Sequence, residues 1–408
     1  MRVLYILCSV LALAAILVVA ISCRTTDLTT PKAGASVAPT PGPSPRSVRP
    51  ITIVAVGDIM LGSTSINDTF LPPNDGRDML KEVEPILSAA DIAFGNLEGP
   101  LLDGGKSEKC SDSPPKSPGV QSNNDVGAAP VPTPTPVPTA GPTVPVKPLI
   151  RCFAFRTPTR YGQYLKDAGF DILSLANNHA SDFGDEGRIS TRKVLDELGI
   201  KHAGSDRGRH STAYLEVEGL RVAFVAFAHN AISPNVNELD AARQFVAAAA
   251  KKSDIVVVSF HGGAEGAAFE RVPRRLEMLG SEKRGNLPLF ARAVIDAGAD
   301  LVLGHGPHVL RGMEIYKDRL VAYSMGNFAT YGMFNLKGPQ GISAIFRITL
   351  APDGKFVSGK IVPTKQEGRG IPALDETGAA IKKLRQLSVL DFAGSAPKIA
   401  DDGTVSMK

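Results

Sequence analysis

Residues 171–184 read DILSLANNHASDFG, and this stretch decides how the rest of the chain is expected to fold. It begins with an apolar, β-prone run at 172–175 and ends abruptly in Asn177, Asn178 and His179. In α/β proteins, ligands bind outside the carboxyl ends of buried strands. The stretch therefore predicts a buried strand that delivers polar side chains to the mouth of a sheet.

Four other apolar runs also lead into polar residues. They lie at 51–56 (ITIVAV), 91–94 (DIAF), 254–260 (DIVVVSF) and 300–303 (DLVL). Runs with helical spacing lie at 78–89, 159–168, 186–198, 238–252 and 287–297. Hairpins are expected to turn at 218–219, 317–318 and 353–354. Strands and helices alternate in the first half and hairpins are added in the second, which predicts an α/β (α+β) fold of two packed mixed sheets flanked by helices.

The first 50 residues predict an exported protein that is anchored to the cell membrane. Residues 1–22 are typical of a secretory signal, and small residues precede Cys23 as in a bacterial lipidation site. Cys23 is therefore the candidate lipidated residue. The apolar run also fits an ordinary signal or an uncleaved transmembrane anchor. Residues 23–50 are rich in Pro and predict an extended tether, so every alternative places the body on the extracytoplasmic face.

The remaining chain is long enough for one large domain. We expect it at 51–365, followed by a C-terminal helix and tail at 366–408. The helix is expected at 375–388, and the tail from 393 onward is expected to be frayed. Residues 151–156 are a further candidate strand.

A Pro-rich insert at 110–150 interrupts this domain. Eleven prolines fall within residues 114–148, a composition that predicts disorder and not a folded unit. Cys110 and Cys152 bracket the insert. In an oxidising compartment a disulfide bond between them would close its base, and two free thiols are the alternative.

The charge distribution argues against nucleic acid as a partner. The formal net charge is +4, and the first 50 residues already contain five Lys or Arg against one Asp. The rest of the chain is therefore about neutral and lacks the excess of basic residues that nucleic-acid binding requires. A basic tether beside a lipidated Cys23 suits an anionic membrane surface.

Five strand ends carry the residue types of one shared polar site. In chain order they hold Asp58, then Asn96 and Glu98, then Asn177, Asn178 and His179, then His261 and Glu265, then His305 and His308. One polar residue after a strand is commonly part of a turn, but five such ends together favour a site. Carboxylate, carboxamide and imidazole without thiolate suit divalent Mn, Fe, Mg or Zn. Two such ions about 4 Å apart can clamp a phosphoryl group.

Several motifs resemble those of the CapA family, the bacterial capsule synthesis or poly-γ-glutamate biosynthesis proteins. They are GDIMLG (57–62), GNLEGPL (95–101), LANNHASDFG (175–184), FHGGAE (260–265), GADLVLGHGPHVLRGMEIY (298–316) and YSMGNF (323–328). The resemblance spans about 51–350 and is interrupted by the insert. It implies a calcineurin-like metallophosphatase fold with four αββα layers. It also implies a cell-surface protein that makes, anchors or exports an anionic polymer.

The resemblance implies roles for particular residues. The implied ligands of one or two divalent ions are Asp58, Glu98, Asn178, His261, His305 and His308. His179 is implied as an acid or electrostatic clamp, and Asn177 and Glu265 are further catalytic candidates. Met60 stands where a second ligand of the first motif is expected, and this departure leaves a one-metal or metal-free site as alternatives.

Four more residues are candidates for supporting the site or binding substrate. Asp182 is the expected partner of a site histidine. Asn96 and Asn327 are placed to orient other groups. Arg311 is a candidate for holding a phosphate or carboxylate, and an exposed arginine at a strand end is the alternative.

Two functional hypotheses follow. The first is an exported CapA-like protein with a metal-dependent hydrolase site for a phosphoester or a polymer amide. The second is a non-catalytic accessory that binds an anionic polymer during export or anchoring. Met60 favours the second and the four site histidines favour the first. The expected partners are an anionic polymer or phosphorylated substrate, the membrane and capsule-synthesis membrane proteins.

Overall fold

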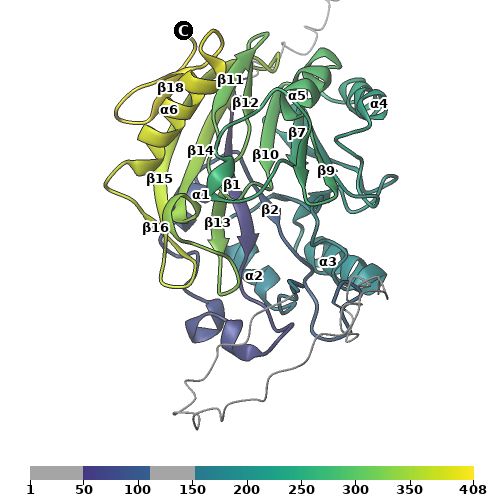
Figure 1. The fold of residues 1–408 in the computed structure, drawn as a ribbon. Coiled ribbons are helices and arrows are strands. Elements are labelled where there is room, and N and C mark those ends of the chain that lie inside the picture. The colour runs from purple at the N-terminus through teal and green to yellow at the C-terminus, as the bar shows by residue number, and fades with distance from the viewer. Residues whose placement is uncertain (1–48, 111–151) are drawn as a thin grey trace, which may run out of the picture. The chain divides into compact units, whose positions relative to one another are not determined.

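The computed structural model describes residues 49–110 and 152–408, which are coloured by position in Figure 1. The predictions for the signal, for Cys23, for nearly all of the tether and for the Pro-rich insert lie outside these residues. Among the described helices, none has both the length and the apolar content needed to cross a membrane.

Strands and helices alternate through the first half of the described chain. The larger sheet contains β1 (Ile51–Met60), β2 (Ile92–Leu97), β3 (Ile172–Ser174), β4 (Lys201–Ala203), β13 (Asn327–Thr330), β14 (Ile342–Leu350), β15 (Phe356–Glu367), β16 (Ile371–Leu374), β17 (Lys398–Ile399) and β18 (Thr404–Ser406). The smaller sheet contains β5 (Thr212–Val217), β6 (Leu220–Ala228), β7 (Ile255–His261), β10 (Leu301–His305), β11 (Met313–Tyr316) and β12 (Arg319–Ala322). A separate hairpin consists of β8 (Glu277–Leu279) and β9 (Glu282–Gly285). The helices are α1 (Glu84–Leu87), α2 (Tyr161–Asp167), α3 (Gly184–Glu197), α4 (Leu239–Ala250), α5 (Leu287–Asp296) and α6 (Ala379–Phe392).

Both large sheets are mixed, and each has a parallel centre. In the larger sheet the strand order is β17-β18-β15-β14-β1-β2-β3-β4, with β13 beside β1 and β16 beside β15. In the smaller sheet the order is β11-β12-β10-β7-β6-β5. Strands β1 to β4 run parallel, as do β6, β7, β10 and β12. Parallel neighbours end at the same edge, so polar residues after these strands gather there.

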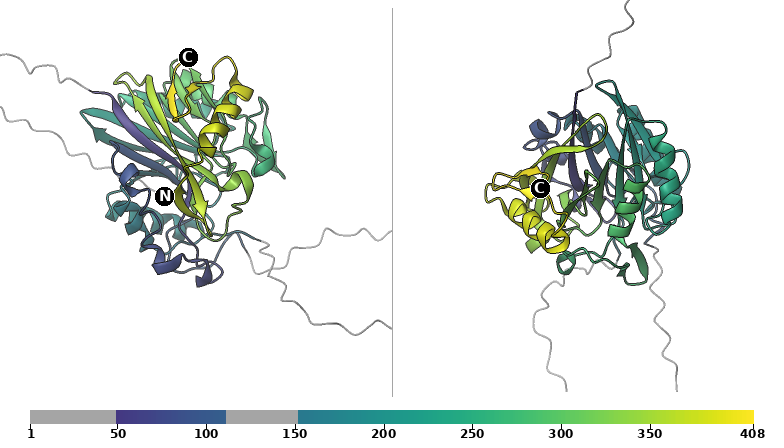
Figure 2. Two further views of the ribbon diagram at one scale, coloured as in Figure 1. Left: turned by 90° about the vertical axis from the view of Figure 1, so that its left-hand side faces the viewer. Right: turned by 90° about the horizontal axis from the view of Figure 1, so that it is seen from above.

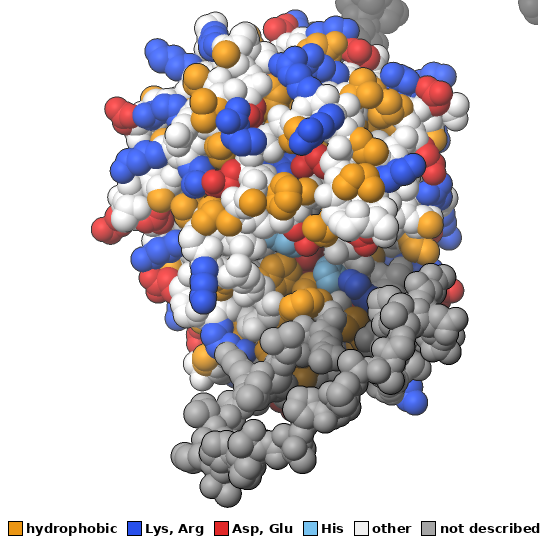
Figure 3. Space-filling view, viewed as in Figure 1, with side chains coloured by type: hydrophobic (Ala, Val, Ile, Leu, Met, Phe, Trp, Pro, Cys, Tyr) orange, Lys and Arg blue, Asp and Glu red, His pale blue; other side chains and the backbone are white. Residues whose placement is uncertain are grey.

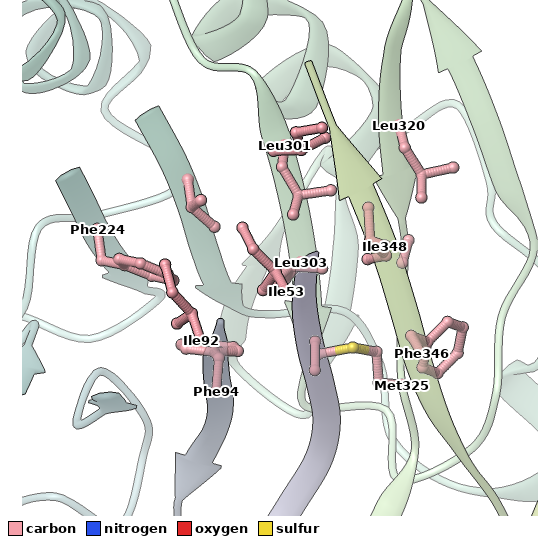
Figure 4. Close-up of a cluster of buried hydrophobic side chains, with 14 of the residues drawn as sticks. Ile53, Ile92, Phe94, Phe224, Leu301, Leu303, Leu320, Met325, Phe346 and Ile348 are labelled. Atoms are coloured by element: carbon pink, nitrogen blue, oxygen red, sulfur yellow. The ribbon is translucent and has the colours of Figure 1, made fainter. Parts of the chain in front are cut away.

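The two sheets pack face to face, and β1 shows why. Its side chains alternate between the two faces of the sheet, as in every strand. Ile53 lies in the cluster between the sheets, together with Phe224 of the smaller sheet, whereas Val54 lies in the cluster on the outer face. Figure 4 shows this inner cluster, in which Ile53 and Phe94 of the larger sheet meet Phe224 and Leu303 of the smaller one.

Helices cover the outer faces of both sheets (Figure 2). Leu165 of α2 and Leu195 of α3 pack on the larger sheet. Val246 of α4 and Phe290 of α5 pack on the smaller sheet. The fold is therefore a four-layer αββα sandwich, as the sequence predicts.

Two sequence-based expectations for local structure are wrong. The helix expected at 78–89 is limited to Glu84–Leu87, because Pro85 lacks an N–H and obstructs the preceding turn. The described part of 151–156 forms no strand, and the nearest pairing is a single bridge between Leu101 and Thr157.

The C-terminal tail also differs from expectation, because it is not frayed. Strands β17 and β18 pair with each other, and β18 pairs with β15 of the larger sheet. Ile399 and Val405 are buried in the cluster between the sheets. Burial of these two apolar side chains explains why the tail is held in place.

Candidate metal centre

The larger sheet brings three of the predicted site residues side by side. Asp58 of β1 pairs in register with Asn96 of β2 and with Asn327 of β13. The approach of β13 depends on Gly57, because a Cβ there would clash with the carbonyl oxygen of Gly326. The backbone of Asp58 donates to that same carbonyl at 2.9 Å. Glycine before Asp58 is thus a packing requirement of the site.

The smaller sheet supplies the histidines. His261 ends β7 and His305 ends β10, and the two residues pair in register on adjacent parallel strands. His308 follows after Gly306 and has a φ of 58°, in the left-handed region that residues with a side chain rarely occupy. This turn directs His308 back toward Asp58.

Asp58, Glu98 and His261 form the centre of the site. Each offers a ligand atom, and these atoms all lie within 4.8 Å of one another. His305 Nδ1 lies 3.3 Å from Asp58 Oδ1, and Asn96 donates to the same oxygen at 2.9 Å. The side chains of Asp58, Glu98, His261 and His305 are fully buried.

His308 closes one side of this centre. Its Nδ1 donates to Asp58 Oδ2 at 3.0 Å and lies 3.1 Å from Asn327 Oδ1. Its Nε2 lies 3.9 Å from Glu265 Oε2, at the partly exposed rim. Figure 3 looks onto a hollow in which histidine side chains are visible beside acidic and basic ones.

Burial and close charges shift the pKa values of these groups. Burial would raise the pKa of Asp58, but hydrogen bonds from His305 and His308 hold it below its usual value. Burial, together with the charge of Asp58, raises the pKa of Glu98 to about 8. Burial lowers the pKa of His261 well below its ordinary value, which favours the neutral imidazole. A neutral imidazole is the form that binds metal.

The residues present fit a divalent ion. Buried polar atoms usually have a hydrogen-bond partner. Among the described residues, however, Glu98 Oε2, His261 Nε2, His305 Nε2 and Asn178 Oδ1 have none. All four atoms are of the kinds that coordinate divalent metals, and three of them belong to residues in or touching the Asp58 cluster. The unpartnered polar atoms and the set of donor types therefore agree with metal binding.

His179 contacts Phe155, Asp182 and Lys109, which together form the wall around His179. Its Nδ1 donates to Asp182 Oδ2 at 2.7 Å, and its ring stacks on Phe155 with centroids 3.9 Å apart. Lys109 Nζ lies 3.2 Å from Asp182 Oδ1 and 3.2 Å from His179 Nδ1. We assign the Nδ1 proton to the shorter contact with the carboxylate, which leaves a lone pair on Nε2. Burial lowers the pKa of His179 to about 4, although Asp182 opposes the shift.

Asn177 holds the strand ends together. Its amide donates to Asn96 Oδ1 at 3.2 Å and to the Leu97 carbonyl at 2.8 Å, and its Oδ1 accepts from the backbone of His179. All of these bonds are internal, so Asn177 supports the site. Asn178 instead lines a cavity of about 390 Å³ together with His229.

Cys110 and Cys152 form a disulfide bond with their Cα atoms 5.8 Å apart. The chain on either side of the bond builds the wall around His179. Lys109 precedes Cys110, and Phe155 donates its backbone N–H to Asp182 Oδ2 at 2.7 Å. The bond therefore fixes two segments that contact the His179–Asp182 pair.

Arg311 is buried and bonded within the chain, and it does not lie at an exposed strand end. Its guanidinium is fully buried and makes two 2.9 Å bonds to the carboxylate of Glu277. It also donates to the carbonyls of Ala264 and Phe269. Arg311 thus supports the loop that carries Glu265, and four of its five N–H groups are used within the chain.

Two residues near the site were missed by sequence reasoning. Arg284 of β9 is fully buried and contacts both Glu265 and His229. Lys109 contacts His179 and Asp182, as described above. Neither lies in a recognisable motif, so no sequence signal pointed to them.

Met60 stands where a second ligand was expected, and it is part of the apolar core. It is fully buried and packs in a cluster with Phe155 and Met333. A carboxylate at this position would be surrounded by apolar side chains. The first strand therefore offers one carboxylate, Asp58, to a metal.

The fold and the site together define the class of protein. A four-layer αββα sandwich with Asp, Asn and His at adjoining strand ends is the architecture that the motif resemblance implies. The family model of bacterial capsule synthesis protein PGA_cap matches residues 52–129 and 134–331. The chain belongs to this family.

Individual relatives agree with this family. Capsule biosynthesis protein CapA of Bacillus anthracis is 28% identical over 350 residues, which cover 80% of this chain and 71% of that protein. PGA biosynthesis protein CapA of Bacillus subtilis (strain 168) is 30% identical over 288 residues, covering 67% of this chain and 61% of that protein. Among solved structures, a candidate 5′-nucleotidase of Staphylococcus aureus in complex with alpha-ketoglutarate has a TM-score of 0.41 at 12% identity, covering 83% of this chain and 58% of that one.

Proposed function

We propose that this protein is a metal-dependent hydrolase that acts in the synthesis of a capsule or poly-γ-glutamate polymer. The scissile bond would be a phosphoester or an amide of the polymer. One observation carries the proposal: Asp58, Glu98 and His261 converge from three strands with ligand atoms within 4.8 Å. Membership of the capsule synthesis family supports the polymer as the setting.

Asp58, Glu98, His261, His305 and His308 would hold the ion, with Asn178 as a further candidate. A bound divalent ion would act as a Lewis acid on a phosphoryl or carbonyl oxygen. The chain's own contribution is orientation. Asn96 fixes one oxygen of Asp58 and His308 fixes the other, so the carboxylate is held at both ends.

His179 would move a proton at the rim. Asp182 accepts from Nδ1 and thereby points Nε2 away from the carboxylate. In this tautomer Nε2 can accept a proton from an attacking water, or donate to a leaving group once it is protonated. Phe155 stacks on the ring and restricts its rotation. General acid–base catalysis of this kind contributes about 10²–10⁴-fold.

We further propose that the protein is exported and anchored at the extracytoplasmic face of the membrane. Support comes from the apolar run that precedes Cys23 and from the basic, Pro-rich composition that follows it. A disulfide bond between Cys110 and Cys152 suits an oxidising compartment. Capsule-synthesis membrane proteins are the partners that this location would favour.

The test uses the full-length chain purified in detergent. Metal content is measured by mass spectrometry, and hydrolysis is measured with p-nitrophenyl phosphate and with γ-glutamyl oligomers. We expect one or two bound ions per chain and activity that falls about 10²-fold or more in His179→Ala. His210→Gln, a histidine outside the site, is the matched control and should keep full activity. A metal-free and inactive wild type would refute the hydrolase.

The second candidate is a non-catalytic accessory that binds the polymer. The burial of Met60 among apolar side chains favours it, because that position supplies no second carboxylate. In the same experiment, an accessory would bind γ-glutamyl oligomers without hydrolysing them, and His179→Ala would leave that binding unchanged.

A further inference from the structure

A separate cavity lies on the far side of the His179 wall. Its volume is about 490 Å³, and its lining includes Lys106, Ser107, Arg156 and Phe183. It adjoins the His179–Asp182 pair, because Ser107 of its lining donates to the Asp182 carbonyl at 2.9 Å. Phe155 faces His179, whereas its neighbour Arg156 faces the cavity.

The charged side chains that line the cavity are basic. Its lining contains Lys106 and Arg156 but neither Asp nor Glu. Lys106 is exposed and forms no ion pair within residues 49–110 and 152–408. Two carboxylates lie just behind this lining: Glu186 lies against Gly105, and Glu108 lies over Gly184 at the start of α3.

Arg156 is held rigidly and keeps free donors. Its Nε donates to Thr64 Oγ1 at 3.0 Å, its Nη2 to the Thr64 carbonyl at 2.7 Å and its Nη1 to the Gly105 carbonyl at 2.9 Å. All three acceptors are neutral, so the charge of the guanidinium persists. A guanidinium has five N–H groups, and these bonds use three of them. Its stacking over Phe183, with Cζ 5.3 Å from the ring centroid, further fixes its plane.

We propose that this cavity is a subsite for a carboxylate-bearing polymer, which binds one repeat there while a neighbouring repeat reaches the candidate metal centre. The inference rests on the proposed function in taking the polymer as substrate. Arg156 presents two open N–H groups, which suit the two oxygens of a carboxylate. Lys106 adds a second, movable positive charge. An anionic polymer is thus held at a point displaced from the reacting bond.

The test measures binding of a fluorescent γ-glutamyl oligomer to the full-length chain by anisotropy, with chelator present so that no hydrolysis occurs. Lys106→Gln should weaken binding about two- to fivefold, the range for one partly exposed ion pair. Arg156→Gln should weaken it about tenfold or more. Lys252→Gln is the matched control, an exposed lysine outside the cavity, and should change nothing.

Each outcome separates this inference from the proposed hydrolase. If Lys106→Gln and Lys252→Gln have equal effects, or if the wild type does not bind the oligomer, the subsite is refuted even when hydrolysis is observed. An amidated oligomer that binds as well as the charged one also refutes it. Displacement by inorganic phosphate at low millimolar concentration would reassign the cavity to phosphate. His261→Gln should retain binding of the oligomer, because the cavity does not include His261. Conversely, an inactive wild type whose binding of the oligomer still depends on Lys106 would sustain the subsite and refute the hydrolase.

Discussion

The carboxylate of Asp58 accepts a hydrogen bond from His308 Nδ1 at 3.0 Å, although 250 positions separate the two residues. Asp58 belongs to β1 of the larger sheet, and His308 follows β10 of the smaller sheet. The contact therefore ties the two sheets together at the candidate metal centre. The left-handed backbone of His308, with φ of 58°, is a strained conformation of the kind that persists at functional sites.

A divalent metal ion bound at the Asp58 cluster should stabilise the folded chain. An ion at about 100 times its Kd stabilises the folded state by about 2.7 kcal/mol. We expect Mn²⁺, Zn²⁺ or Mg²⁺ to raise the Tm of the wild type in a thermal-shift assay. His261→Gln should abolish that rise, whereas His210→Gln should retain it. Equal metal-induced shifts in both variants would contradict binding at the Asp58 cluster.

The buried pair of Glu277 and Arg311 should be costly to break on one side. Their side chains are 4% and 0% exposed, so a single Glu277→Gln substitution strands a buried charge. We expect a loss of about 3–5 kcal/mol in the free energy of unfolding, measured by urea denaturation. The double variant Glu277→Gln, Arg311→Met removes both charges and should lose less. A double variant that is less stable than Glu277→Gln would show that the charge is not the cause.

Gly57 should tolerate no side chain. A Cβ added at position 57 would clash with the Gly326 carbonyl, which also accepts the backbone hydrogen bond of Asp58. Gly57→Ala should lower the free energy of unfolding by about 1–3 kcal/mol or more and weaken metal binding. Gly208→Ala is the control, because its nearest heavy atom lies 3.7 Å away. Similar stability of the two variants would disprove the packing argument.

Reduction of the disulfide bond should destabilise the wall around His179. The bond closes a loop with a sequence separation of 42, and loops of this size are stabilised by about 2–4 kcal/mol. The double variant Cys110→Ser, Cys152→Ser should have a lower Tm than the oxidised wild type. A reducing agent should lower the Tm of the wild type but not that of the double variant. An unchanged wild-type Tm after confirmed reduction would exclude a stabilising role.

Asp91 should make stability depend on pH in the acid range. Hydrogen bonds from Arg49 lower the pKa of Asp91, against the opposing effect of burial. A depressed carboxylate pKa contributes stability above the unfolded value of about 3.8, and the contribution is lost as pH falls through the folded value. Arg49 is half exposed, so solvent screening keeps the expected contribution small.

Urea unfolding at pH 7 and at pH 2.5 tests this sign. Arg49→Gln should be less stable than the wild type at pH 7 and nearly equal to it at pH 2.5. Arg243→Gln, which removes a partner of the exposed Asp240, is the control and should change little at either pH. A difference that grows at low pH would contradict the assignment.

Local sequence patterns predicted much of the fold. Alternation along β1 and the amphipathic spacing of α3 to α5 depend on neighbouring residues, so they are readable without the structure. Pro85 interrupts the helical pattern at 78–89, and the helix there is correspondingly short. The order of the tail is not readable from local patterns. Strands β17 and β18 are short and gain their stability from β15 and the core, which lie far away in sequence.

The residue types at the strand ends, and hence the hard-metal character of the site, were determined by the sequence alone. Which ends meet was decided only by the tertiary structure, because parallel pairing places Asp58 beside Asn96 and His261 beside His305 without any local signal. Tertiary packing likewise pairs Arg311 with Glu277 and places Lys109 beside His179. The physical reason is that periodicity records which face of an element is buried, whereas contacts across sheets depend on strand order and register.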